Sequence, residues 1–109
     1  MMKTMDESVK GTIFKLNVHM KPINGHHLAD VEWEAEVYAI GGFGKRIIVR
    51  KEDALKIDED NYLIVVDSSI GGAGHYHLTL TAYINDADCP NGIRVERGAC
   101  DTGVVIRTV

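Results

Sequence analysis

Cysteine, proline and aromatic residues are scarce in this sequence. Its 109 residues include two cysteines, two prolines and 6% aromatic residues. No stretch approaches the roughly 20 apolar residues of a membrane-spanning helix, and the segment MMKTMDESVKGT lacks the apolar run of a secretory signal. We therefore expect no membrane partner and cytoplasmic synthesis. Without an oxidising compartment, we also expect Cys89 and Cys100 to be free thiols.

Neither basic nor acidic residues are in large excess. The chain has 12 basic and 16 acidic residues, a formal net charge of −4, and no long block of like charge. Nucleic acid is therefore not an expected partner. The length fits one domain with a modest core. We expect residues 1–11 to form a flexible N terminus and residues 12–109 to form a single domain.

The strongest pattern in the sequence is an alternation of period two. Apolar residues alternate with polar ones over residues 14–20, as in a strand with one buried face. In residues 31–39, Trp33 shares its face with Val31, Ala35 and Val37, while three glutamates take the other face. We predict that Trp33 is buried. Since lysines and a histidine line the solvent face of the first segment, the two strands are expected to be neighbours that pair these charges.

Further segments rich in β-branched and aromatic residues follow, separated by glycine, asparagine and aspartate clusters. They are residues 46–50, 62–67, 75–84 and 93–109. Only residues 51–57 suggest a helical turn, with acidic residues early and Lys56 late. The pattern predicts an all-β fold, an antiparallel β-sandwich of six to seven strands with immunoglobulin-like or related topology, and a small barrel is the alternative.

Two glycine clusters, at residues 40–44 and 70–74, interrupt the strands. A phosphate-binding loop would require Ser or Thr after Gly44-Lys45, where this chain has Arg46. Glycine adopts positive φ without steric cost, so we predict that both clusters are turns.

Metal and catalytic sites have weak support. His75 and His77 share one strand face, and His26 and His27 lie in a loop, but no spacing fixes the three or four ligands of a zinc site. We therefore predict solvent-facing histidines and no cofactor. The candidate nucleophiles are Ser68, Ser69, Cys89 and Cys100, with His75 or His77 as a base, and none lies in a recognised catalytic motif. The chain is predicted not to be an enzyme.

The segment AYINDADCPNGIR raises the question of a calcium loop. Counted from Asp86, Asp88 matches the third position of an EF-hand loop, but Pro90 and Arg97 occupy the fifth and twelfth. Asn91-Gly92 is a strong hairpin signal. We predict a turn at residues 85–92 without calcium.

Arg94 and Glu96 follow this turn and should project from one face. They form either an ordinary solvated pair or a clamp in which Arg94 reaches back to Asp86 or Asp88. Asp86, Asp88, Arg94 and Glu96 are together the predicted interaction loop.

Several short motifs of the carboxy-terminal half occur in a recognisable order. They are Lys51-Glu52-Asp53, Asp58 to Tyr62, Gly71 to Gly74, Asp86 with Asp88, Gly92 with Arg94 and Glu96, and Thr102-Gly103. This order resembles the small β-sandwich domains encoded among tail genes of phages and prophages, related to the amino-terminal domain of upper baseplate proteins. The resemblance favours the Arg94 clamp, because the family pairs its D-x-D loop with this arginine.

The resemblance implies a structural or assembly module of a tail or baseplate-like particle, without catalysis. Its implied partners are other tail or baseplate proteins or further copies of itself, and its implied location is the virion. The alternative is a carbohydrate-binding β-sandwich, for which Tyr38, Tyr76 and Tyr83 are the candidate stacking residues.

Overall fold

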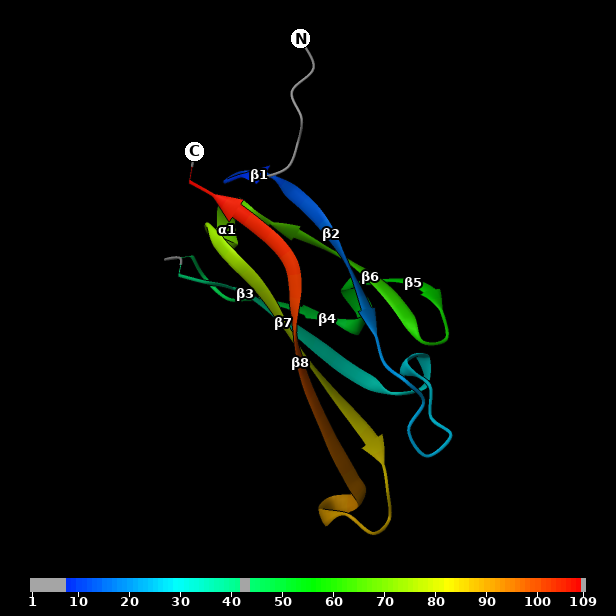
Figure 1. Ribbon diagram of the computed structural model, residues 1–109. Coiled ribbons are helices and arrows are strands. Elements are labelled where there is room, and N and C mark those ends of the chain that lie inside the picture. Colours follow the sequence, from blue (N-terminus) through cyan, green and yellow to red (C-terminus); the bar gives the residue numbers. More distant parts are fainter. Residues whose placement is uncertain (1–7, 42–43, 109) are drawn as a thin grey trace.

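The computed structural model describes residues 8–41 and 44–108, which form two β-sheets packed on a shared core (Figure 1). One sheet has the strand order β1-β8-β7-β3-β4 and the other the order β2-β6-β5. The strands are β1 (Ser8–Val9), β2 (Ile13–His19), β3 (Glu32–Ile40), β4 (Ile47–Arg50), β5 (Leu55–Asp58), β6 (Asn61–Asp67), β7 (Gly74–Asn85) and β8 (Ile93–Arg107). The helical segments are short: η1 (Leu28–Asp30), η2 (Lys51–Asp53), α1 (Ser68–Gly71) and η3 (Pro90–Gly92).

The strand order is that of an immunoglobulin-like sandwich. The run β8-β7-β3-β4 corresponds to strands G, F, C and C′, and β2-β6-β5 corresponds to B, E and D. All pairs are antiparallel except β1, which pairs parallel to the end of β8. The predicted antiparallel sandwich is therefore confirmed. Of the predicted flexible N terminus, residues 1–7 lie outside the described residues, and Ser8–Val9 form β1.

The core contains the predicted face of β3. Val31, Trp33, Ala35 and Val37 are all buried, so the predicted register is confirmed. The Trp33 ring meets Tyr62 of β6 edge-on, with ring centroids 5.1 Å apart. Since β3 and β6 belong to different sheets, this aromatic contact joins the two layers.

The predicted pairing of the first two long strands is wrong. β2 pairs with β6, whereas β3 pairs with β7 and β4 in the other sheet. The basic residues next to the glutamates of β3 come from β4 and the segment before it. Arg46 forms an ion pair with Glu36, and Arg50 of β4 lies opposite Glu34. Alternation fixes which face of a strand is buried, but not which strand lies beside it.

Tyr76 marks a further immunoglobulin-like feature. It lies near the start of β7, is fully buried, and donates from its hydroxyl to the Gly72 carbonyl. A tyrosine near the start of strand F that bonds backbone a few residues upstream is the tyrosine corner of these sandwiches. Tyr76 is therefore unavailable for the sugar stacking considered above.

The segment after β4 is only partly as predicted. η2 supplies the expected helical turn, and Lys51 donates from Nζ to the carbonyls of Ala29 (2.7 Å) and Val31 (2.8 Å). The chain then forms β5, which was not predicted. All four residues of β5 are exposed, the apolar Leu55 and Ile57 included, so this strand has no buried face.

His27 ties the loop before η1 to the β5–β6 turn. Its Nδ1 lies 2.8 Å from Oδ1 of Asp60, and this hydrogen bond, together with nearby negative charge, raises the pKa of His27. A histidine with a raised pKa stabilises the fold below its ordinary pKa of about 6.5, and this stabilisation is lost as the pH rises through the raised value.

We therefore expect His27→Gln to lower the melting temperature more at acidic pH, where the pair is charged, than at alkaline pH. Thermal unfolding followed by circular dichroism on both sides of neutrality measures the difference. His26→Gln, at the neighbouring position, is the matched control. An equal loss at both pH values in His27→Gln would contradict a charged pair.

Candidate functional site

The predicted loop at residues 85–92 is the turn that joins β7 to β8. Asp86 donates from its backbone N–H to the Gly92 carbonyl at 2.9 Å, and its carboxylate accepts from the Asp88 N–H at 3.0 Å. Asn91 and Gly92 have φ values of 58° and 71°, as an Asn-Gly turn requires. Asp86 thus orders the turn, while Asp88 is exposed at its tip.

Arg94 and Glu96 project from one face of β8, as predicted, and form an ion pair with each other. Among the described residues, no hydrogen bond or ion pair joins Arg94 to Asp86 or Asp88. The structure therefore favours the pair over the clamp. Arg94 lies opposite Ile84 and Glu96 opposite Ala82, both buried residues of β7, so the pair lies on the core side of its sheet.

Both cysteines are free, as expected. Cys100 is exposed on β8. Burial, followed by the negative charge of Asp86, raises the pKa of the Cys89 thiol. A raised pKa disfavours the reactive thiolate, so Cys89 has the character of a structural residue.

The two serine candidates make local contacts. Ser68 is buried and accepts a hydrogen bond from the Gly11 N–H at 2.9 Å. Ser69 donates from its hydroxyl to Asp67 at 2.6 Å. Among the described hydrogen bonds, neither serine contacts a histidine, so these bonds pair neither serine with a base.

The free edge of β8 is the most distinctive feature of this region. β8 has 15 residues, and β1 covers it only at Ile106 and Arg107. Within the described chain, residues 93–105 have β7 on one side and no strand on the other. Because Asp86 and Gly92 form a hydrogen-bonded pair, the alternation of an antiparallel ladder turns the backbone groups of every second residue outward. These residues are Ile93, Val95, Arg97, Ala99 and Asp101.

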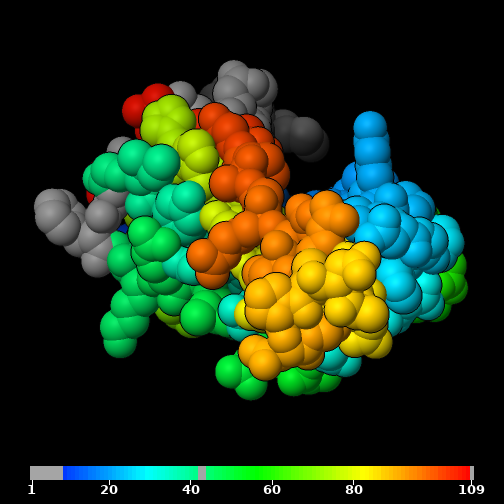
Figure 2. All heavy atoms as spheres, turned by 90° about the horizontal axis from the view of Figure 1, so that it is seen from below, coloured from blue at the N-terminus to red at the C-terminus, as the bar shows by residue number. Residues whose placement is uncertain are grey.

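An apolar groove of about 340 Å³ runs beside this edge, between β2 and β8. Val18, Met20 and Ile23 line one wall, and Leu78, Leu80 and Ala82 of β7 lie in its floor, with residues 96–100 of β8 along the rim. Figure 2 looks onto this end of the molecule, where the β7–β8 turn stands foremost beside residues 20–30. The two sheets thus leave their apolar faces open along this side.

The outer surface near the turn is also partly apolar. Val95 is 56% exposed and Tyr83 is 39% exposed. Of the other tyrosines considered for sugar binding, Tyr38 is covered by Arg46, 4.5 Å from the ring centroid, and stacks on His77. Tyr83 is therefore the one exposed residue of the three predicted stacking residues, which weakens the carbohydrate alternative.

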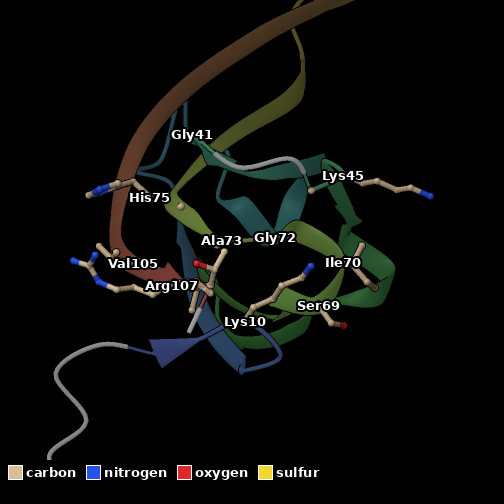
Figure 3. A pocket seen from close by; sticks show the side chains of 14 residues that line it. Lys10, Gly41, Lys45, Ser69, Ile70, Gly72, Ala73, His75, Val105 and Arg107 are labelled. Carbon is tan, nitrogen blue, oxygen red and sulfur yellow. The ribbon is translucent and has the colours of Figure 1, made fainter.

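A second cavity, of about 810 Å³, lies at the opposite end, where the two glycine clusters meet (Figure 3). Lys10, Lys45, His75 and Arg107 contribute to its lining. In Figure 3, Lys45 and His75 point away from the cavity and Lys10 extends across it. The cations therefore do not converge on one point, as anion binding would require.

Comparisons with known proteins give no assignment: no protein-family model matches the chain, and neither a curated protein nor a solved structure shows significant similarity. The described residues contain no group of three or more His, Cys, Asp or Glu side chains that could hold a metal ion. Within residues 8–41 and 44–108, no helix is long and apolar enough to cross a membrane.

Sequence reasoning identified the turn but not the free edge and its groove. The run Gly98-Ala99-Cys100, three small residues in the middle of a strand, was the available signal.

Proposed function

We propose that the chain is a non-enzymatic structural module that docks to protein partners through the free edge of β8. The main support for this proposal is that the edge of β8 is unpaired among the described residues. In the described part of the chain, residues 93–105 present backbone donors and acceptors with no neighbouring strand, next to an apolar groove.

Strand addition suits this geometry. An extended segment of a partner gains main-chain hydrogen bonds from the open edge, and every second side chain can enter the adjoining groove. Natural proteins usually shorten, charge or cover such edges because they promote unwanted association. Here the open edge lies on the longest strand of the fold, and its centre consists of small residues. A partner strand accounts for both features.

The proposed setting is a tail or baseplate-like particle, in which the partners are other particle proteins or further copies of this chain. This setting is supported by the order of motifs in the carboxy-terminal half. The motifs themselves act locally: Asp58 accepts from the Asp60 N–H and the Asn61 side chain, and Thr102 donates to the Tyr76 carbonyl. Because these side chains bond to other parts of the same chain, the contacts support a structural role over catalysis.

Ala99→Pro tests the docking edge. Ala99 is exposed and its N–H points away from β7, so proline removes a donor from the edge without removing a bond to β7. We expect the wild-type chain, co-expressed with the proteins encoded beside it, to be purified in a complex, and Ala99→Pro to be left out. Native mass spectrometry of the purified complexes gives the composition.

Ala87→Pro is the matched control. Ala87 is exposed in the β7–β8 turn, at the second position of the turn closed by the Cys89 N–H and the Asp86 carbonyl, where proline is favoured. This variant should enter the complex like the wild type. Incorporation of Ala99→Pro at the wild-type level, or a wild-type chain that joins no complex, would overturn the proposal.

A further inference from the structure

We propose that the free edge of β8 pairs with the same edge of a second copy, antiparallel, about a two-fold axis at Ala99. This inference rests on the proposed docking function and names its partner. It would join the five-stranded sheets of two copies edge to edge, with the axis between their β8 strands.

The backbone restricts the possible registers. Only residues whose backbone groups point outward can bond across the new interface, and these are the odd-numbered residues from 93 to 101. Near Thr102 the β7–β8 register shifts, and β1 occupies the edge at Ile106 and Arg107. The regular part of the edge that can receive a second strand is therefore residues 93–101.

Charge selects one register from this set. With the axis at Ala99, Arg97 lies opposite Asp101 of the second copy, and the symmetry makes this ion pair twice. An axis at Glu96, Arg97 or Asp101 would place each of these charges opposite its own copy, which is destabilising. An axis at Gly98 or Cys100 would leave both charges without a partner across the strands. An axis at Val95 would place Arg94 opposite Glu96 of the second copy, but these two residues already form an ion pair within each copy.

Gly98 independently indicates that another backbone comes close to this part of β8. An added Cβ would meet no atom within 4 Å, and its φ lies outside the positive range, so this chain's own fold does not require glycine there. Glycine inside a strand weakens it and often marks a position where another backbone comes near. In the proposed register, Gly98 lies opposite Cys100 of the second copy, on the groove side of the sheet.

The pairing would form about six main-chain hydrogen bonds, from three hydrogen-bonded pairs of residues. Arg97 and Asp101 each make one local hydrogen bond within their own copy. Arg97 donates from Nε to Thr81 at 3.2 Å, and Asp101 accepts from the Gly103 N–H at 2.8 Å. Each side chain therefore keeps further donors or acceptors for the opposite charge.

Charge reversal provides the main test. Arg97→Asp places two aspartates opposite each other at both ends of the interface, and Asp101→Arg places two arginines there. We expect each variant to weaken the wild-type dimer roughly tenfold or more, measured as Kd by analytical ultracentrifugation. A one-to-one mixture of the two variants should form a heterodimer, because every pair across the interface is then of opposite charge. Native mass spectrometry distinguishes the heterodimer by its mass, and misfolding of either variant would not produce it.

A disulfide tests the register. In a Cys89→Ser background, Gly98→Cys should form an intermolecular disulfide with Cys100 on mild oxidation, because the two residues are directly opposed at a separation that a disulfide can span. Adding Cys100→Ser should abolish this crosslink. A crosslink that survives Cys100→Ser would contradict the axis at Ala99.

Failure of this inference differs from failure of the docking function. A chain that stays monomeric at high micromolar concentration, or a dimer insensitive to both charge reversals, overturns self-pairing through this edge. If that same chain still enters a complex with a neighbouring protein and Ala99→Pro does not, the docking function stands with a different partner.

Discussion

Replacement of Trp33 by alanine is expected to lower the free energy of unfolding by about 3–5 kcal/mol. Trp33 is 3% exposed and lies between the sheets, edge-on to Tyr62. Alanine would remove this interlayer contact and leave a cavity in a core that draws on both sheets. Urea unfolding followed by far-ultraviolet circular dichroism measures the loss, since Trp33 is the sole tryptophan and its fluorescence disappears with it.

Trp33→Phe is the matched control. Within the described residues the indole Nε1 is buried without a hydrogen-bond partner, so phenylalanine gives up no hydrogen bond and keeps an aromatic ring near Tyr62. Its loss should be clearly smaller than that of alanine. A near-neutral Trp33→Ala would mean that Trp33 does not lie in the core and that the β3 register is shifted by one residue.

The burial of Trp33 was predictable because it depends on local alternation alone. The neighbours of its strand were not. β2 and β3 follow one another in the sequence and carry complementary outer charges, but the chain crosses between sheets through η1, so β2 pairs with β6. Consecutive strands often pair, and here the exception arises from the immunoglobulin-like order, which period-two patterns do not encode.

Tyr76 could have been placed more accurately from the sequence. His75 and His77 were assigned to the solvent face, and alternation then puts Tyr76 on the core face with Leu78. Its hydroxyl partner, the Gly72 carbonyl, lies four residues upstream and could not be inferred without the turn geometry. A buried tyrosine needs such a partner.

The candidate site was predicted in part. Asn91-Gly92 identified the turn, because its conformation depends on neighbouring residues. The free edge depends on which strand ends the sheet, a property of long-range pairing between β8, β7 and β1. The partner of Arg94 likewise depends on side-chain geometry. Its guanidinium could bind Glu96, two residues along the same face, or reach back to Asp86 or Asp88 in the turn, and the sequence alone does not decide between them.

For the glycine clusters, too, the local conformation was predictable and the long-range contact was not. Each was predicted as a turn, and Gly41, Gly72 and Gly74 do have positive φ values. Residues 42–43 of the first cluster lie outside the described residues. The contact between the clusters was not predicted: Lys45 donates from its N–H to the Ile70 carbonyl at 3.0 Å, and a Cβ on Gly44 would lie 2.0 Å from the Gly71 carbonyl oxygen. The glycines are needed for this backbone approach as well as for turning.

Gly74→Ala is accordingly expected to lower the free energy of unfolding by about 2–5 kcal/mol. Gly74 has a φ of 137°, which residues with a side chain rarely adopt, and an added Cβ would lie 2.4 Å from the Ile40 carbonyl oxygen. Because this oxygen belongs to the backbone at the end of β3, no side-chain rotation can relieve the clash. The ends of β3 and β7 must move apart, which weakens the pairing of the two central strands.

Gly98→Ala is the matched control for this change, because it adds the same methyl group where nothing lies within 4 Å and φ is not positive. Alanine restricts the unfolded chain, so this variant should be neutral or more stable by up to about 1 kcal/mol. Urea titrations of both variants and the wild type, at one low protein concentration, keep self-association out of the comparison. Equal stability of the two alanine variants would show that the close approach of Gly74 to β3 does not exist, whereas a loss confined to Gly74→Ala assigns the cost to that backbone contact.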